Sequence, residues 1–129
     1  MDNRIAALCG FLDRSRSVYH AHRELVNELE ANGYRCLSAT EAWELVPGGK
    51  YYATRGGTAL VAFRIPHEAP KGFMISASHS DRPTFKLKEN PELNGIYTRL
   101  GVERYGGMLS ASWLDRPLSA AGKVTCLLY

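Results

Sequence analysis

The stretch that decides the fold reads Phe73-Met74-Ile75-Ser76-Ala77-Ser78, and it is apolar or small at every position. Gly72 precedes it, and a segment that contains charged residues follows it. A short apolar run with such flanks predicts a strand that is buried on both faces. We therefore expect residues 73–78 to lie inside the sheet of an α/β fold.

The triplet His79-Ser80-Asp81 follows this run directly and would lie at the end of a strand, where open α/β sheets place ligands. In extended backbone, residues i and i+2 point the same way, so the imidazole and the carboxylate would project together. A neutral imidazole binds zinc, and a nearby carboxylate can orient the ring. A His-x-Asp triplet is also common by chance, and the alternative is a histidine that is hydrogen-bonded to a loop.

The residues alone supply no convincing second ligand for a catalytic zinc, which needs about three protein ligands. His67 lies in a loop after Pro66, and nothing in the spacing brings it to His79. Asp115 beside Arg116 is more typical of a structural salt bridge or a turn. The sequence also contains neither a phosphate-binding P-loop nor the elbow of a serine hydrolase.

Two helices are predicted before this stretch. The first is short, and Ser15 to Ser17 would interrupt it. Ser17 can cap the second helix, and Asn32-Gly33 supplies the left-handed residue that commonly ends a helix. The apolar positions that define these helices are Ile5, Leu8, Phe11 and Leu12 in the first, and Val18, Ala21, Leu25 and Leu29 in the second.

A helical turn and a hairpin are predicted between the second helix and residue 66. The pattern Ser38-x-x-Glu41 has the form of a capping box and predicts a short helical turn through Trp43 and Leu45. Residues 50–54 and 58–65 alternate with period two around Arg55-Gly56-Gly57, which predicts a hairpin.

After Pro83 the composition changes to polar alternation, with turn signals at Asn90-Pro91 and Asn94-Gly95. The closing run, Val124 to Tyr129, has the pattern of a strand and would leave an apolar edge. A natural terminus is usually polar and exposed. We therefore expect that the chain is truncated, against the alternative that a last strand docks into a sheet.

Composition favours one ordinary globular domain, since 45% of the 129 residues are hydrophobic. The net charge of +3 comes from basic residues that are scattered, so a nucleic-acid partner is disfavoured. No signal peptide is recognisable and no apolar run approaches the roughly 18 to 20 residues of a membrane span, so we expect no membrane association. Three widely spaced cysteines, Cys9, Cys36 and Cys126, indicate reduced thiols and a cytoplasmic protein.

Several segments, taken in order, resemble the aspartyl aminopeptidase family of zinc metallopeptidases. Agreement along nearly the whole chain is much more specific than the His-x-Asp triplet alone. The matching segments are Phe11-Leu12-Asp13, Ser17-Val18-Tyr19-His20-Ala21, Trp43-Glu44-Leu45, Pro47-Gly48-Gly49-Lys50-Tyr51-Tyr52, Ser78-His79-Ser80-Asp81-Arg82-Pro83, Leu87-Lys88, Gly101-Val102-Glu103, Tyr105-Gly106-Gly107 and Trp113-Leu114-Asp115-Arg116.

This resemblance implies the start of a three-layer α/β catalytic domain with a central mixed sheet, in residues 1–90. Residues 91–129 would begin an inserted β-rich domain that helps to build a homo-oligomer. The family's histidine ligand of zinc corresponds to His79, and Asp81 would be the catalytic residue that supports it. Arg82 stands where the family has a small residue, which places bulk and charge beside the site.

The same resemblance implies two zinc ions in a complete member, of which only the ligand His79 is identified here. The other ligands and a general-base glutamate would lie beyond residue 129, so the isolated chain is expected to be inactive. Peptides, in part of the family with an acidic amino-terminal residue, would be the substrates. The alternative is a non-catalytic, truncated domain that self-associates or retains only a relic metal site.

Overall fold

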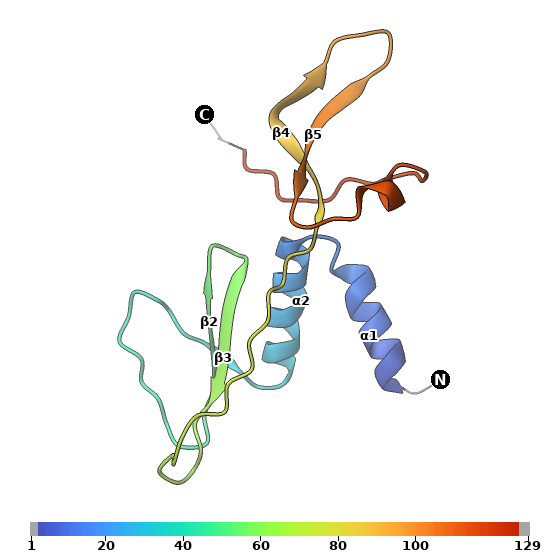
Figure 1. Cartoon of the computed structure of the whole chain (residues 1–129). Coiled ribbons are helices and arrows are strands. Elements are labelled where there is room, and N and C mark those ends of the chain that lie inside the picture. Colours follow the sequence, from blue (N-terminus) through green and yellow to red (C-terminus); the bar gives the residue numbers. More distant parts are fainter. Residues whose placement is uncertain (1–2, 127–129) are drawn as a thin grey trace. The chain divides into compact units, whose positions relative to one another are not determined.

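The computed structural model describes residues 3–126, which divide into two compact units. Of the described residues, 3–80 and 121–126 form the first unit, and 81–120 form the second. The first unit contains two helices and a mixed sheet of three strands, and the second contains an antiparallel pair (Figure 1). The expected mixed α/β fold class is confirmed. The domain division at residue 90 stays a prediction.

Both predicted helices are present, as α1 (Asn3–Arg14) and α2 (Val18–Ala31). Ser17 occupies the N-cap position of α2 with extended backbone, but its hydroxyl lies 2.8 Å from Nδ1 of His20 and caps no amide. Gly33 follows α2 with φ of 78°, as the glycine signal predicted. The two helices are joined by an ion pair, in which Arg14 Nε lies 2.6 Å from Glu24 Oε2.

The mixed sheet has the order β1-β2-β3, from β1 (Arg35–Cys36), β2 (Lys50–Arg55) and β3 (Ala59–Arg64). Strand β1 is parallel to β2, and β2 is antiparallel to β3, so the predicted hairpin is confirmed. Its core is the buried set Leu37, Tyr51 and Ala53, against which Phe63 and Ile65 pack.

The prediction of a helical turn after Ser38 is wrong. The hydroxyl of Ser38 accepts a 3.3 Å hydrogen bond from the amide of Thr40, two residues later. In a capping box it would accept from the amide three residues later. The carbonyl oxygen of Ser38 accepts a second bond, 2.7 Å long, from the indole nitrogen of Trp43. These two bonds hold residues 38–43 in a turn, and this described segment contains no helix.

The buried strand expected at residues 73–78 is also wrong. The segment forms no strand, and Figure 1 draws it as a thin tube without an arrow. Phe73, Met74 and Ile75 are 93%, 102% and 83% exposed. A strand buried on both faces needs hydrogen-bonded neighbours and covering layers, and the described residues provide neither at this segment.

The second unit is built on β4 (Thr84–Leu93) and β5 (Arg99–Tyr105), followed by the 3-10 turn η1 (Ser110–Trp113). The turn predicted at Asn94-Gly95 is confirmed, because it lies between these strands. The turn predicted at Asn90-Pro91 is wrong, since both residues lie inside β4. Proline removes one ladder hydrogen bond there, and the pairing shifts register between Leu87 and Glu92.

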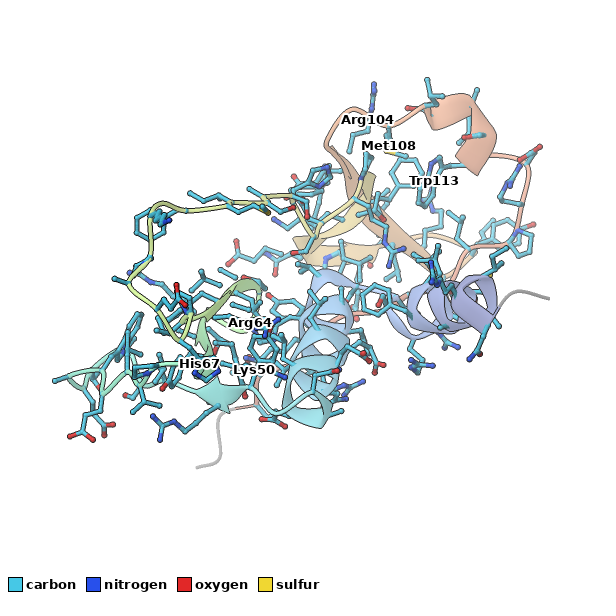
Figure 2. The ribbon with its side chains drawn as sticks, turned by 90° about the horizontal axis from the view of Figure 1, so that it is seen from below. Lys50, Arg64, His67, Arg104, Met108 and Trp113 are labelled. Carbon is cyan, nitrogen blue, oxygen red and sulfur yellow. The ribbon has the colours of Figure 1, made fainter. Side chains whose placement is uncertain are left out.

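A small cluster beside the hairpin gives the second unit its packing. Met108 is buried, and the rings of Phe85 and Trp113 meet edge to face with centroids 5.7 Å apart. Arg104 donates a 3.3 Å hydrogen bond to the carbonyl oxygen of Met108, and Figure 2 labels Arg104, Met108 and Trp113 in this region.

The strand expected in the closing run is not formed by Val124 to Cys126, and Val124 is 85% exposed. The rest of that expectation, at residues 127–129, lies outside the described residues. Within residues 3–126, no helix has the length and apolar character needed to cross a membrane.

Candidate functional site

The hairpin of the second unit sets the position of Asp81. Thr84, the first residue of β4, pairs with Tyr105, the last residue of β5. Asp81 lies three residues before Thr84, so this register brings Tyr105 to the aspartate across 24 residues of sequence. The phenol hydroxyl of Tyr105 donates a 2.5 Å hydrogen bond to Oδ2 of Asp81.

This hydrogen bond defines the electrostatics of the contact. A distance of 2.5 Å is typical of a hydroxyl that donates to an ionised carboxylate. The hydrogen bond to Asp81 and the negative charge of that carboxylate raise the pKa of Tyr105 above its ordinary value. Tyr105 therefore stays protonated and able to donate over the whole neutral range.

His79 lies two residues before Asp81, in a segment of the first unit without regular secondary structure, and it is exposed. The expectation that it follows a hydrogen-bonded strand is wrong, because residues 73–78 form none. Its assignment as a zinc ligand, and that of Asp81 as the catalytic residue that supports it, stay predictions. Asp81 itself is half-buried and held by Tyr105.

The donor chemistry of the triplet fits zinc in kind, since imidazole and carboxylate are both zinc ligands. The number of donors is smaller than a catalytic zinc requires. No group of three histidine, cysteine, aspartate or glutamate side chains within residues 3–126 is placed to hold a metal ion. The described part of the chain would therefore supply only part of a zinc ligand set.

The other residues weighed from the sequence lie elsewhere. The ring of His67 is packed so closely against Gly48 that a Cβ there would collide with it, and Figure 2 shows His67 near the start of β2 at Lys50. Asp115 lies 3.2 Å from Nε of Arg116, which is the salt bridge that the sequence favoured.

Sequence reasoning missed Tyr105 as a partner of Asp81. The tyrosine was part of a segment that carries the family resemblance, but no spacing rule connects it with a residue 24 positions earlier. Only a correct register for β4 and β5 could have found the contact.

Comparison with known proteins identifies the family. The family model described as "Aminopeptidase I zinc metalloprotease (M18)" matches residues 11–127. The chain therefore belongs to the M18 family, the aspartyl aminopeptidase family of zinc metalloproteases, and the resemblance seen in the sequence is confirmed.

Curated relatives of this chain are aminopeptidases of the same family. The probable M18 family aminopeptidase 2 of Pseudomonas aeruginosa strain PAO1 is 45% identical over 122 residues, which are 92% of this chain and 28% of that protein. The corresponding protein of Pseudomonas fluorescens strain SBW25 is 41% identical over 121 residues, with the same coverage of 92% and 28%. The chain thus spans 28% of the length of these relatives.

Solved structures of similar fold come from the same family. The mApe1 dodecamer of S. cerevisiae superposes with a TM-score of 0.80 at 30% identity, over 88% of this chain and 28% of that one. The mApe1 of Chaetomium thermophilum gives a TM-score of 0.74 at 32% identity, over 84% of this chain and 26% of that one.

Proposed function

We propose that this chain contributes to a zinc-dependent aminopeptidase that removes amino-terminal residues, including acidic ones, from peptides. In this proposal His79 is one zinc ligand, and Asp81 is the catalytic residue that supports it. The observation that carries the proposal is the family match over residues 11–127, which includes both residues.

The roles of the two residues follow from their chemistry. Zinc, when bound, would supply Lewis-acid chemistry to the peptide carbonyl and to the attacking water. His79 would hold the ion through one ring nitrogen, in the neutral form that metal binding requires. Asp81 would keep the ring in one orientation, as carboxylates commonly do beside histidine ligands.

The isolated chain is proposed to be inactive. Support comes from the donor count, since residues 3–126 place no three metal-binding side chains together and a catalytic zinc takes about three. The other ligands of the two expected zinc ions, and the general base, would then come from the part of the relatives' length that this chain does not span.

A homo-oligomer and a cytoplasmic location complete the proposal. The neighbour from S. cerevisiae is a dodecamer, which supports self-assembly of a complete relative of this chain. Cys9, Cys36 and Cys126 are all free and exposed, which supports a reducing compartment.

The first test measures bound zinc and the hydrolysis of leucyl, aspartyl and glutamyl peptides by purified residues 1–129. Weak zinc binding that His79→Ala abolishes, without turnover, is the expected result. His67→Ala is the matched control, because His67 is also an exposed histidine but lies outside the triplet. If His79→Ala still binds zinc as the wild type does, His79 is not the zinc ligand.

Activity can be tested in a chimera, in which this chain replaces the matched segment of the Pseudomonas aeruginosa relative. We expect the chimera to hydrolyse peptides with acidic amino-terminal residues. His79→Ala should abolish turnover in it, and Asp81→Asn should lower activity about 10- to 100-fold, as for other groups that orient a metal ligand. An active chimera that tolerates His79→Ala would contradict the proposal.

A second candidate function is a non-catalytic domain that self-associates. The observation that favours it is the exposure of Phe73, Met74 and Ile75, which form a continuous apolar run. If the chain forms an oligomer of defined stoichiometry and His79→Ala does not change its zinc binding, this second function is favoured over the first.

A further inference from the structure

We propose that Tyr105 is a positioning residue, whose hydroxyl holds the carboxylate of Asp81 in the orientation that supports His79. The inference deepens the proposed function and rests on it for the role of Asp81. The contact itself is independent of that role, because it is a hydrogen bond between two side chains of the second unit.

The strength of the contact favours positioning over chance. The 2.5 Å bond between Tyr105 Oη and Asp81 Oδ2 joins a neutral donor to a charged acceptor, which is among the stronger kinds of hydrogen bond. Tyr105 is 44% exposed, so water competes for the same groups. Because of this competition, the bond contributes modestly to stability. Its fixed direction still favours one side-chain rotamer of Asp81.

The register of the hairpin makes this contact specific. Lys86 pairs with Glu103 across the strands, and their charged groups lie 3.6 Å apart. Glu103 and Tyr105 are two residues apart in β5 and so share one face of the hairpin. A slip of one residue would turn Tyr105 to the opposite face and break its bond to Asp81.

Fixing one oxygen restricts the whole carboxylate. Asp81 has two rotatable side-chain bonds, and a hydrogen bond to Oδ2 selects among the staggered rotamers that χ1 allows. A carboxylate accepts several hydrogen bonds at once, so the bond from Tyr105 is compatible with contact to an imidazole. Tyr105 would thereby act on a zinc ligand through Asp81, without contact with metal or substrate.

The test is Tyr105→Phe in the full chain, which removes the hydroxyl and keeps the ring. Three-bond NMR couplings report the χ1 rotamers of Asp81. We expect one dominant χ1 rotamer of Asp81 in the wild type and a measurable change in its χ1 populations in Tyr105→Phe, with the backbone amide signals of β4 and β5 unchanged. Tyr97→Phe is the matched control, because Tyr97 is 77% exposed and lies in the turn between these strands.

A reciprocal variant keeps the test decisive if Tyr105→Phe alters the hairpin. Asp81→Ala should release the tyrosine, so the χ1 couplings of Tyr105 should show averaging. Asp81 χ1 populations that are unchanged in folded Tyr105→Phe, or Tyr105 χ1 populations that are unchanged in Asp81→Ala, would overturn the inference. These readouts need no metal and no activity.

A zinc titration, followed on the ring signals of His79, tests the functional consequence. Tyr105→Phe should raise the Kd for zinc about tenfold, at the low end for groups that orient a ligand, and Tyr97→Phe should not. In an Asp81→Ala background the effect of Tyr105→Phe should vanish. If His79→Ala leaves zinc binding intact, the proposed function fails, and the rotamer measurements still decide the positioning of Asp81.

Discussion

Among single residues, Tyr52 shows how one side chain joins a helix to a sheet. Tyr52 is 3% exposed in β2, and its hydroxyl donates a 2.6 Å hydrogen bond to Oε1 of Glu30 near the end of α2. The acceptor is a charged carboxylate, so the bond is stronger than one between neutral groups. Tyr52 thus links the packing of the sheet to the position of α2.

We expect Tyr52→Phe to lower the free energy of unfolding by about 1 to 2 kcal/mol, because the ring remains and only the hydroxyl bond is lost. Glu30 is exposed, so water can solvate its carboxylate in the variant. Urea denaturation measures the change. Tyr97→Phe, at a 77% exposed position, is the control and should stay within about 0.5 kcal/mol of the wild type. Equal effects of the two variants would refute the prediction.

The same bond should give this stabilisation a pH dependence. The hydrogen bond to Glu30 and, next, burial raise the pKa of Tyr52 above its ordinary 10.0. Since the folded-state pKa is the higher one, the stabilisation is complete below about pH 10 and declines as the pH rises toward the folded-state pKa. The difference in unfolding free energy between wild type and Tyr52→Phe should be constant from about pH 7 to 9 and smaller near pH 11. A difference that grows with pH would argue against this bond.

At the scale of elements, the β2–β3 hairpin depends on two glycines with left-handed backbone. Gly56 and Gly57 have φ of 64° and 71°. No heavy atom lies within 4 Å of a Cβ built on Gly57, so space does not limit a side chain there. The backbone conformation alone therefore selects glycine at this position.

We expect Gly57→Ala to destabilise the chain by about 1 to 2 kcal/mol, which is the cost of left-handed backbone for an L-residue. Thermal or urea unfolding measures it. Gly72→Ala is the matched control, because Gly72 also has no atom within 4 Å of such a Cβ and is not among the glycines with positive φ. If both substitutions cost the same, backbone conformation is not the cause.

For the whole molecule, the exposed run Phe73-Met74-Ile75 dominates the expected behaviour in solution. These side chains are 83% to 102% exposed, although their composition is that of a protein core. Apolar runs exposed in this way promote association. Association of the chain is compatible with both proposed functions, since both involve assembly.

Size-exclusion chromatography with light scattering measures the molar mass of the isolated chain in solution. We expect a mass above the 14.3 kDa of the monomer. Met74→Ser combined with Ile75→Ser should lower the apparent mass, because the apolar surface available for association is reduced. Leu109→Ser changes an 81% exposed leucine outside the run and should leave the mass unchanged. A monodisperse monomer with sharp, cooperative unfolding would contradict the expectation.

Local patterns predicted much of the fold correctly. The apolar period and the serine and glycine signals placed α1 and α2, and Gly56-Gly57 placed the β2–β3 hairpin, because these features depend on residues close in sequence. The capping-box interpretation at Ser38 failed because its hydroxyl bonds the amide of Thr40, an alternative that the same residues allow.

The sequence by itself determined α1, α2, the β2–β3 hairpin and the family, since each is encoded by neighbouring residues or by motifs in order. Only the tertiary structure decided that residues 73–78 form no strand, because a strand requires partners that its own sequence does not specify. It also decided that Tyr105 holds Asp81. That contact spans 24 residues and depends on the register of β4 and β5, which only the folded hairpin determines.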